Sequence, residues 1–423
     1  MRTISARAIL ILSLAACPAT AAERVPTSAE TALTLPECYQ LALKRSETIA
    51  IQQELIRETE GRFIQSISTA LPRVSFVLSE KRQDGSGGSA FTLRSVPERK
   101  FTLSQPLFAG FKEFAAMAGS RAERQERIFQ KARAEQLLVV DVADAFYLVL
   151  EEQEDLSALE TTQTALLQRV EELKQREQLG RSRRSEVVSA EAQLRRTEAE
   201  IERIRGETAT AGQLLEFLTG RSPVGALDET DAVLPELEPE AHYTMQAGAR
   251  PDVRAAEEAW RVTRREVNIA QAKFLPTVDL DANYYTKRAG VAADVNWDAT
   301  VTVDVPLFQG GQAAGALREA TSKSRQAKLT FERTQREAVL DIQDLYARLQ
   351  AAVARSTALK AALDATEESY RLQVEDDRLN LVNNLDVLLS LQLLQDAQRE
   401  FVHARAETKR LSWQLRAATG HTL

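Results

Sequence analysis

The chain has 423 residues and a formal net charge of −7, with 44% hydrophobic and 27% charged residues. The acidic balance argues against the basic surface of a nucleic-acid-binding protein, and only 3 histidines are present, which argues against a metal-ligand cluster. With 17 glycines and 12 prolines, the composition favours long helices over β-sandwiches or disorder.

The N-terminus has the pattern of an export signal. Basic residues are followed by an apolar stretch and by the small residues Ala19-Thr20-Ala21, so residues 1–21 are predicted to be a signal peptide. The alternative is lipoprotein processing at Leu14-Ala15-Ala16-Cys17, after which Cys17 would carry lipid. We favour the first, because about six apolar residues precede that box, against the roughly 7–15 that are usual. Cys38 would then be the one cysteine left, which precludes an internal disulfide.

The remainder of the chain is a duplication, and its offset is constant from Pro106 to Gly220. Pro106-Leu107-Phe108 returns as Pro306-Leu307-Phe308, and Asp141 returns as Asp341 (306 − 106 = 200; 341 − 141 = 200). Loops tolerate changes in length, whereas packed helices in a fixed register do not. The sequence therefore predicts two copies of one length-critical unit. Their bounds, with a C-terminal tail, are 22–220, 221–420 and 421–423.

Each copy is expected to begin with a helix that ends at a Leu-Pro pair. In the first copy, Ala42, Ile49 and Ile56 recur every seven residues and give the predicted helix at 35–67 an apolar face. The corresponding helix of the second copy is predicted at 241–273.

A β-hairpin is expected after each of these helices, at 73–107 and at 277–306. Apolar and polar residues alternate from Val278 to Tyr285 and from Asp298 to Val305, as in a strand with one apolar face. Strands of about 9–11 residues match a tilted membrane strand, and no later run approaches the ~20 apolar residues of a transmembrane helix. The alternative is an exposed hairpin on a soluble domain. Aspartates on the polar face need water, which favours a filled lumen over a dry core.

Long helices are predicted beyond the hairpins. Pro106 and Pro306 are expected to end the strands, because proline has no donor for the ladder. Proline-free segments and heptads then predict two long helices and two return helices that pack as antiparallel coiled coils. Their ranges are 110–178, 311–378, 185–218 and 385–418. A long helix would measure ~100 Å and a return helix ~50 Å, so the first short helix of each copy is expected to cover the remaining half.

These residues resemble the TolC-type outer-membrane efflux proteins over about 35–420. The most specific features are the duplicated Pro-Leu-Phe, the Leu-Pro pairs, and the tip patterns Leu179-Gly180 and Leu379-Asn380. The resemblance implies a mostly α fold with a small β part. Three chains would each give four strands to a twelve-stranded outer-membrane barrel, and the coiled-coil hairpins would form a periplasmic α-barrel. Residues 220–240 and the C-terminal tail would form an equatorial belt.

The same resemblance implies a passive conduit in the outer membrane of a Gram-negative bacterium, extending into the periplasm. A homotrimer in outer-membrane lipid would receive solutes from an inner-membrane RND, ABC or MFS pump through a periplasmic adaptor. No cofactor, nucleic acid or catalysis is expected, since the chain has no nucleophile–base pair or Cys/His set. The alternatives are a periplasmic adaptor, which should have one hairpin between β-rich halves, and a cytoplasmic coiled-coil scaffold, which would need no export signal.

The resemblance also assigns a role to the turns between long and return helices, where adaptor hairpins would dock. The candidate docking residues are Leu179, Gly180, Arg181, Leu379, Asn380 and Leu381. Gly180 and Asn380 independently suit the left-handed backbone that ends a helix. A plain coiled-coil turn is therefore the alternative.

Acidic residues follow the same turns. Asp386 aligns with the family's acidic ring at the constriction, and Glu186 is its counterpart in the first copy. Three Asp386 carboxylates would attract cations. The alternative is that each acid stabilises the first turn of its helix, by ~0.3–1 kcal/mol. Where the family pattern has a second acid, three residues after Asp386, this chain has Leu389. The positions of the family's polar lock fall on Asp377 and Val382, so a Tyr–Arg lock is predicted to be absent or differently built.

Overall fold

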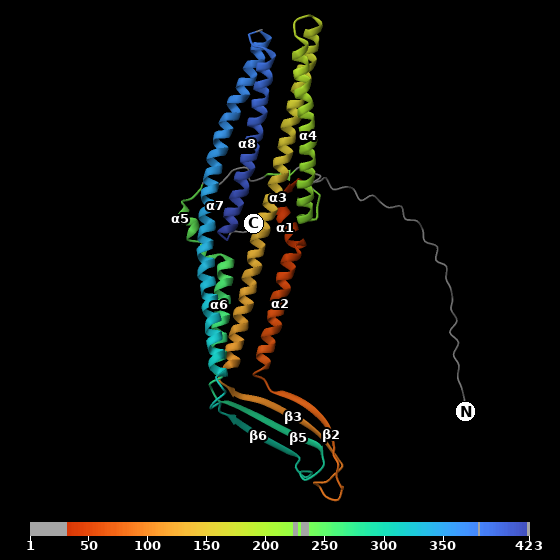
Figure 1. Ribbon diagram of the computed structural model, residues 1–423, viewed down its shortest axis with the longest axis vertical. Coiled ribbons are helices and arrows are strands. Elements are labelled where there is room, and N and C mark those ends of the chain that lie inside the picture. Colours follow the sequence, from red (N-terminus) through yellow and green to blue (C-terminus); the bar gives the residue numbers. More distant parts are fainter. Residues whose placement is uncertain (1–31, 223–226, 230–236, 380, 421–423) are drawn as a thin grey trace, which may run out of the picture.

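The computed structural model shows a long rod of helices with a small sheet at one end (Figure 1). It describes residues 32–222, 227–229, 237–379 and 381–420. Four of the sequence predictions lie outside the described residues: the signal peptide at 1–21, lipidation of Cys17, the role of Asn380, and the tail at 421–423.

Helices account for most of the described chain. In chain order, the elements are β1 (Leu33–Thr34), α1 (Leu35–Arg45), α2 (Glu47–Ser68), β2 (Arg73–Arg82), β3 (Ser95–Ala109), α3 (Lys112–Gln178), α4 (Arg184–Thr219), β4 (Leu227–Asp228), α5 (Glu240–Thr244), the 3-10 turn η1 (Ala247–Ala249), α6 (Pro251–Ala272), β5 (Thr277–Arg288), β6 (Trp297–Asp304), α7 (Gln312–Arg378) and α8 (Asn384–Ala418).

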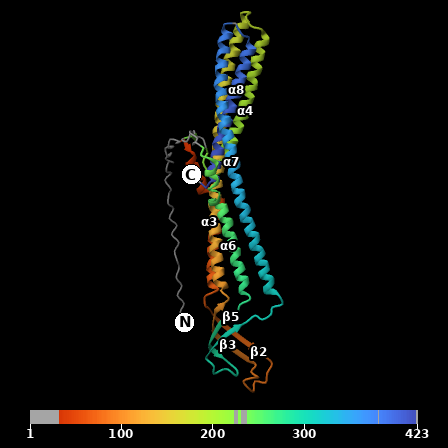
Figure 2. The same cartoon turned by 90° about the vertical axis from the view of Figure 1, so that its left-hand side faces the viewer.

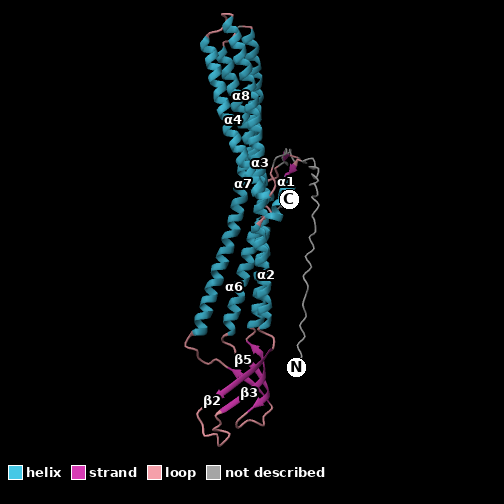
Figure 3. Ribbon diagram, turned by 90° about the vertical axis from the view of Figure 1, so that its right-hand side faces the viewer, coloured by secondary structure: helices cyan, strands magenta, loops and turns pink. Residues whose placement is uncertain are grey.

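The main sheet is antiparallel, with the strand order β2-β3-β5-β6 (Figure 3). The pairing of β3 with β5 joins the two copies, whereas β2 and β6 are edge strands in the described chain. The prediction that Pro106 ends its strand is wrong: β3 continues to Ala109, and its register against β5 shifts between Pro106 and Phe108. Proline fits at such a bulge because the ladder is interrupted there. Pro306 does lie beyond its strand, since β6 ends at Asp304.

Both predicted short helices are interrupted, so the prediction of continuous helices at 35–67 and 241–273 is wrong. The first separates into α1 and α2 at Ser46, and the second into α5, η1 and α6 before Pro251. The residue preceding the second piece is extended in each copy, with ψ 112° at Ser46 and ψ 136° at Arg250. Proline disfavours a helical residue before it, and the Ser46 hydroxyl caps the first turn of α2.

The long helices α3 and α7 have 67 residues each. The return helices α4 and α8 run beside the half away from the sheet, and α2 and α6 beside the half next to it (Figure 1). Heptad residues predicted to form the coiled-coil seam are buried, among them Leu159, Leu166, Ile201 and Ile204. Two shorter helices together therefore cover the length of each long helix.

The helices form an open layer rather than a closed bundle. In the half near the sheet, α3 contacts α2 and α6; in the other half it contacts α4 and α8, and α7 contacts α6 and α8. One edge of the layer is therefore made by α2 and α4, and the other by α7. Figures 2 and 3 show that α1, partway along the rod, lies to one side of the layer. There it packs on α3 through a core that includes Cys38, Ala42, Val142 and Phe146.

Among the described residues, none of the helices combines the length and the apolar character needed to cross a bilayer.

Candidate functional site

The turn after α3 closes that helix with two backbone hydrogen bonds. Gly180 has a φ of 71°, in the left-handed region. Its N–H donates to the carbonyl of Glu177 at 2.8 Å, and the N–H of Arg181 donates to the carbonyl of Arg176 at 2.7 Å. This is a Schellman cap, which satisfies carbonyls that the end of a helix leaves open. The turn leaves Leu179 71% exposed at the end of the rod.

The turn after α7 contains the equivalent bond. The N–H of Leu381 donates to the carbonyl of Asp376 at 2.9 Å, which corresponds to the Arg181–Arg176 bond of the first copy (381 − 181 = 200). Leu379 and Leu381 are 64% and 70% exposed. Both turns lie at the end of the rod farthest from the sheet (Figure 1). Each tip therefore presents apolar side chains to its surroundings on a backbone that hydrogen bonds hold in place.

The two tips differ in charge. The first carries Arg181, Arg183 and Arg184, and none of the three forms an ion pair with a residue in the described ranges. The corresponding residues of the second tip are uncharged: Leu381, Asn383 and Asn384. The residues that follow the first turn are therefore basic, whereas residues 381–384 of the second tip are uncharged; there, the exposed Arg378 and a run of acidic residues precede the turn.

Glu186 and Asp386 both cap the helix that they begin. The Glu186 carboxylate accepts hydrogen bonds from Ser182 Oγ at 2.5 Å and from the N–H of Arg183 at 3.3 Å. Asp386 accepts from the N–H of Asn383 at 3.2 Å, and Asn383 Oδ1 accepts from the N–H of Asp386 at 3.1 Å. The second pair is a reciprocal capping box. The first copy has only half of it, because a guanidinium has no acceptor.

Asp377 is the centre of a buried ion-pair network near the tips. Its carboxylate accepts hydrogen bonds from Arg169 Nη1 at 2.7 Å and from Arg176 Nη1 at 3.2 Å. Arg169 Nε also donates to Asn384 Oδ1 at 2.8 Å, and both arginines contact Glu172. Asp377 is 4% exposed and Arg169 is 9% exposed. The network thus ties α3 of the first copy to α7 and α8 of the second.

Electrostatics keep this network ionised. Burial opposes the charge of Asp377, but the hydrogen bond and charge of Arg169, with the charge of Arg176, hold the pKa of Asp377 below its ordinary value. Sequence reasoning located Asp377 but missed its main partner, which lies 208 residues away. A signal was present, because Arg169 adjoins the seam residue Val170, and arginine is rarely buried without a partner.

The described residues contain no group of three His, Cys, Asp or Glu side chains that could hold a metal ion. Cys38 is buried in the equatorial core, where desolvation, with a smaller effect of the Glu37 charge, raises the pKa of its thiol to about 11. A thiol in that environment is a packing residue rather than a nucleophile.

A sequence model described as "Outer membrane efflux protein" matches residues 38–221 and 245–421. Among curated proteins, the chain is similar to the alkaline protease secretion protein AprF of Pseudomonas aeruginosa, with 23% identity over 400 residues that cover 88% of this chain and 82% of the relative. It is also similar to the outer membrane protein TolC of Vibrio cholerae, with 24% identity over 310 residues that cover 69% of each.

Solved structures share the fold. The outer membrane protein VceC of Vibrio cholerae superposes with a TM-score of 0.78 at 22% identity, covering 91% of this chain and 96% of VceC. The open state of the MtrE outer membrane channel of Neisseria gonorrhoeae superposes with a TM-score of 0.77 at 19% identity, covering 91% of this chain and 88% of MtrE.

Proposed function

The chain belongs to the outer membrane efflux protein family, and we propose that three copies of it close into one exit duct that an adaptor joins to an inner-membrane pump. Members of this family are channels, and this chain is an outer-membrane channel of the kind that serves tripartite efflux and type I secretion.

Ring closure is proposed because the sheet and the helix layer each have two unpaired edges, and these edges lie on the same two sides of the chain. Among the described elements, β2, α2 and α4 lie along one edge, and β6 and α7 along the other. An edge strand leaves its N–H and C=O groups unpaired. Pairing β6 and α7 of one copy with β2, α2 and α4 of the next is a heterologous contact, which closes when the rotation completes a circle. Three copies would supply twelve strands.

The sheet surface supports this placement. Val301 and Val303 of β6 are each 60% exposed, and Val74 of β2 is 70% exposed. Exposed apolar side chains along paired strands suit contact with lipid acyl chains. The experiment is membrane fractionation followed by native sizing of the full chain. Trimers in the outer membrane are expected, and a water-soluble monomer would end the proposal.

The two tips are proposed to dock the periplasmic adaptor. One exposed leucine is present at the first tip and two at the second, and the cluster Arg181, Arg183 and Arg184 is present at the first tip alone. An adaptor surface that fits the first tip should therefore be acidic. Arg181→Glu is expected to weaken adaptor binding and its dependence on salt, measured with purified adaptor on the solubilised channel. The matched control is Arg195→Glu, because Arg195 lies on α4, the helix that follows the turn, at a distance from the tip; its side chain is 76% exposed and paired with Glu198. Equal effects of both substitutions would contradict a specific tip.

The Asp386 carboxylates are proposed to line the constriction, with Glu186 as their counterpart. Because Asp386 also caps α8, a simple deletion confounds charge with helix stability. Asn383→Ala removes the partner of the capping box and retains the charge. In bilayer recordings, Asp386→Ala should reduce cation selectivity or enlarge the current, and Asn383→Ala should not. Matching changes in both variants would assign the effect to capping and remove the gate.

A further inference from the structure

The two copies differ at the junction where a short helix meets the long one. Ser46 and Arg250 each immediately precede a helix of 22 residues, α2 or α6, and correspond to one another (250 − 46 = 204). Asp141 and Asp341 correspond on α3 and α7 (341 − 141 = 200). The same backbone positions therefore carry an arginine and an aspartate in the second copy, and a serine and an aspartate in the first.

In the second copy, the arginine occupies the junction. Arg250 is 3% exposed. Its Nη1 and Nη2 each lie 3.2 Å from Asp341 Oδ2, and Nη2 lies 2.6 Å from Asp252 Oδ2. Nη1 also approaches the carbonyl of Ala338 at 3.5 Å. A buried guanidinium thus neutralises two carboxylates at this place.

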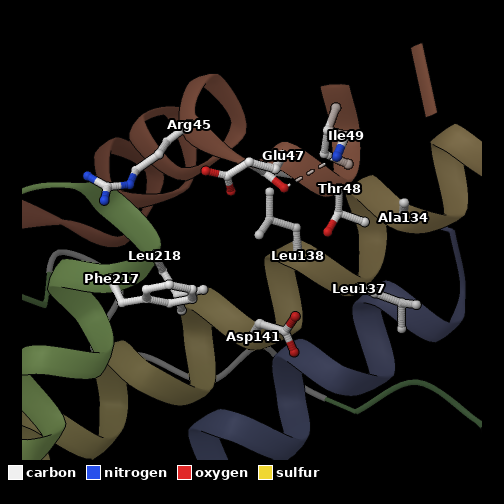
Figure 4. A pocket seen from close by; sticks show the side chains of 11 residues that line it. Arg45, Glu47, Thr48, Ile49, Ala134, Leu137, Leu138, Asp141, Phe217 and Leu218 are labelled. Carbon is white, nitrogen blue, oxygen red and sulfur yellow. Dashed lines mark hydrogen bonds between the residues drawn. The ribbon is translucent and has the colours of Figure 1, made fainter. Parts of the chain in front are cut away.

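In the first copy the carboxylate is retained, and Ser46 stands where the second copy has Arg250. Asp141 is exposed to solvent and has no hydrogen bond or ion pair with any residue that the structure describes, and partial desolvation raises its pKa. A cavity of about 400 Å³ opens beside it, lined by Ser46, Glu47 and Phe217 among others (Figure 4). Arg45 also lines the cavity, but Figure 4 shows it directed away from Asp141, and its guanidinium lies against Gly220.

The cavity continues into a groove that has apolar walls. A second hollow of about 510 Å³ shares Asp141, Phe217 and Leu218 with the first, and its far part is lined by Asp144 and Arg410, whose charge acts on Asp144. Phe217 is 70% exposed, and Leu137, which lines the other side of the first cavity, is 48% exposed (Figure 4). Small-molecule sites measure roughly 300–1,000 Å³ and combine apolar walls with a few polar groups. An aromatic ring near a carboxylate adds attraction for a cation.

We propose that the groove between Ser46, Asp141 and Phe217 binds a small organic cation, with an amidinium, guanidinium or ammonium group on an apolar body. Asp141 is its counter-ion, as Asp341 is the counter-ion of Arg250. The apolar part lies against Phe217 and Leu137. The guanidinium that the second copy supplies from its own chain is, in the first copy, supplied by the ligand.

The groove lies on the face of α3 that would line the channel in the proposed ring. Leu137, Asp141 and Asp144 are spaced four and three residues apart, so they share one face of α3. Val142 and Phe146 lie on the opposite face, in the core that α1 covers. We place α1 on the outside of the proposed ring, and the groove, on the opposite face of α3, then faces the channel. This placement rests on the proposed function; binding at Asp141 does not.

Benzamidine and its neutral isostere benzamide test the site, by calorimetric titration of the full-length channel in detergent. A charge-assisted pair is expected to make benzamidine bind at least about tenfold more tightly than benzamide. Asp141→Asn should abolish that preference. Asp341→Asn, the matched position of the second copy, should retain it. Equal binding of the two compounds to the wild type, or an unchanged preference in Asp141→Asn, would overturn the proposal.

A gain-of-residue variant provides a second test. Ser46→Arg with Leu138→Ala introduces into the first copy the arginine and the alanine that the second copy has at Arg250 and Ala338. Its own guanidinium should fill the groove and remove benzamidine binding. Retained binding in a folded double variant would contradict the site, and if that variant does not fold, Asp141→Asn decides. Bilayer conductance of the same preparations without benzamidine separates the two ideas. If wild-type trimers conduct but do not prefer benzamidine over benzamide, the binding site alone is overturned. If the wild type does not conduct, the proposed channel is overturned.

Discussion

Removing the charge of Asp377 should loosen the end of the rod. Asp377→Asn keeps the side-chain shape but leaves the buried Arg169 and the half-buried Arg176 without their shared counter-ion. Breaking a buried pair from one side typically costs 3–5 kcal/mol, and Glu172 still neutralises both arginines in part, so we expect about 3 kcal/mol. That free energy corresponds to roughly a hundredfold shift in the local opening equilibrium.

Hydrogen exchange measures this shift directly. Amides at the start of α8, from Asn384 to Leu391, should exchange roughly a hundredfold faster if they open locally, and the bilayer open probability should rise. The control is Glu407→Gln, which breaks the pair of Glu407 with Arg355; those side chains are 47% and 58% exposed. An exposed pair contributes at most about 1 kcal/mol. The reasoning is refuted if Asp377→Asn exchanges no faster than Glu407→Gln.

The pH dependence of this network follows from the pKa of Asp377. Its pKa is lowered in the folded chain, despite burial, by Arg169 and Arg176. A carboxylate with a depressed folded pKa contributes stability that is present above its unfolded pKa of about 3.9 and is lost as the pH falls through the folded value. Exchange in the first turns of α8, corrected for intrinsic rates, should therefore be constant from about pH 5 to 8. A steep change within that range would exclude Asp377 as the controlling group.

Further predictions concern other parts of the chain. The hydrogen bond that His403 Nδ1 donates to the Glu151 carboxylate raises the pKa of His403, although desolvation opposes it. This α3–α8 contact should therefore be fully stabilising below about pH 6.5 and be lost as the pH rises through the raised value. In thermal melts, His403→Gln should reduce the loss of stability between pH 6 and 9. Gly180→Ala should destabilise the first tip by about 1 kcal/mol because φ is positive, whereas Gly206→Ala in α4 should stabilise that helix by about 0.5–1 kcal/mol, both by denaturant unfolding. Cys38 should react with a thiol reagent only after unfolding, and rapid labelling of the native chain would contradict its burial.

Repetition and heptad periodicity predicted the long helices, because a helix is determined largely by residues that are close together in the sequence. Helix α3 was expected at 110–178 and is Lys112–Gln178. The break before Pro251 was predictable from the effect of proline on the preceding residue, but the break at Ser46 was not, because a serine inside an apolar seven-residue repeat also fits a continuous helix.

The candidate site was less predictable, for a different reason. The Schellman turn is local, and Gly180 indicated it from the sequence. The network around Asp377 joins groups that only the packing of α3 on α7 and α8 brings together, and no periodicity pairs an arginine with an aspartate 208 residues away. The cavity beside Asp141 likewise depends on packing, because only the folded chain places Arg250 against Asp341 in the second copy and leaves the equivalent place open in the first.

The equal lengths of the copies have a physical cause that can be tested by insertion. One alanine added after Glu160 in α3 would turn the rest of the helix by about 100°. Leu166 and Leu173, both buried in the seam, would then face away from α4, and Arg169 could no longer reach Asp377. The full chain should lose native trimers. The same insertion after Ser89, in the loop between β2 and β3, should leave them intact, because loops absorb changes in length. Intact trimers after the helical insertion would show that register does not hold the two copies to one length.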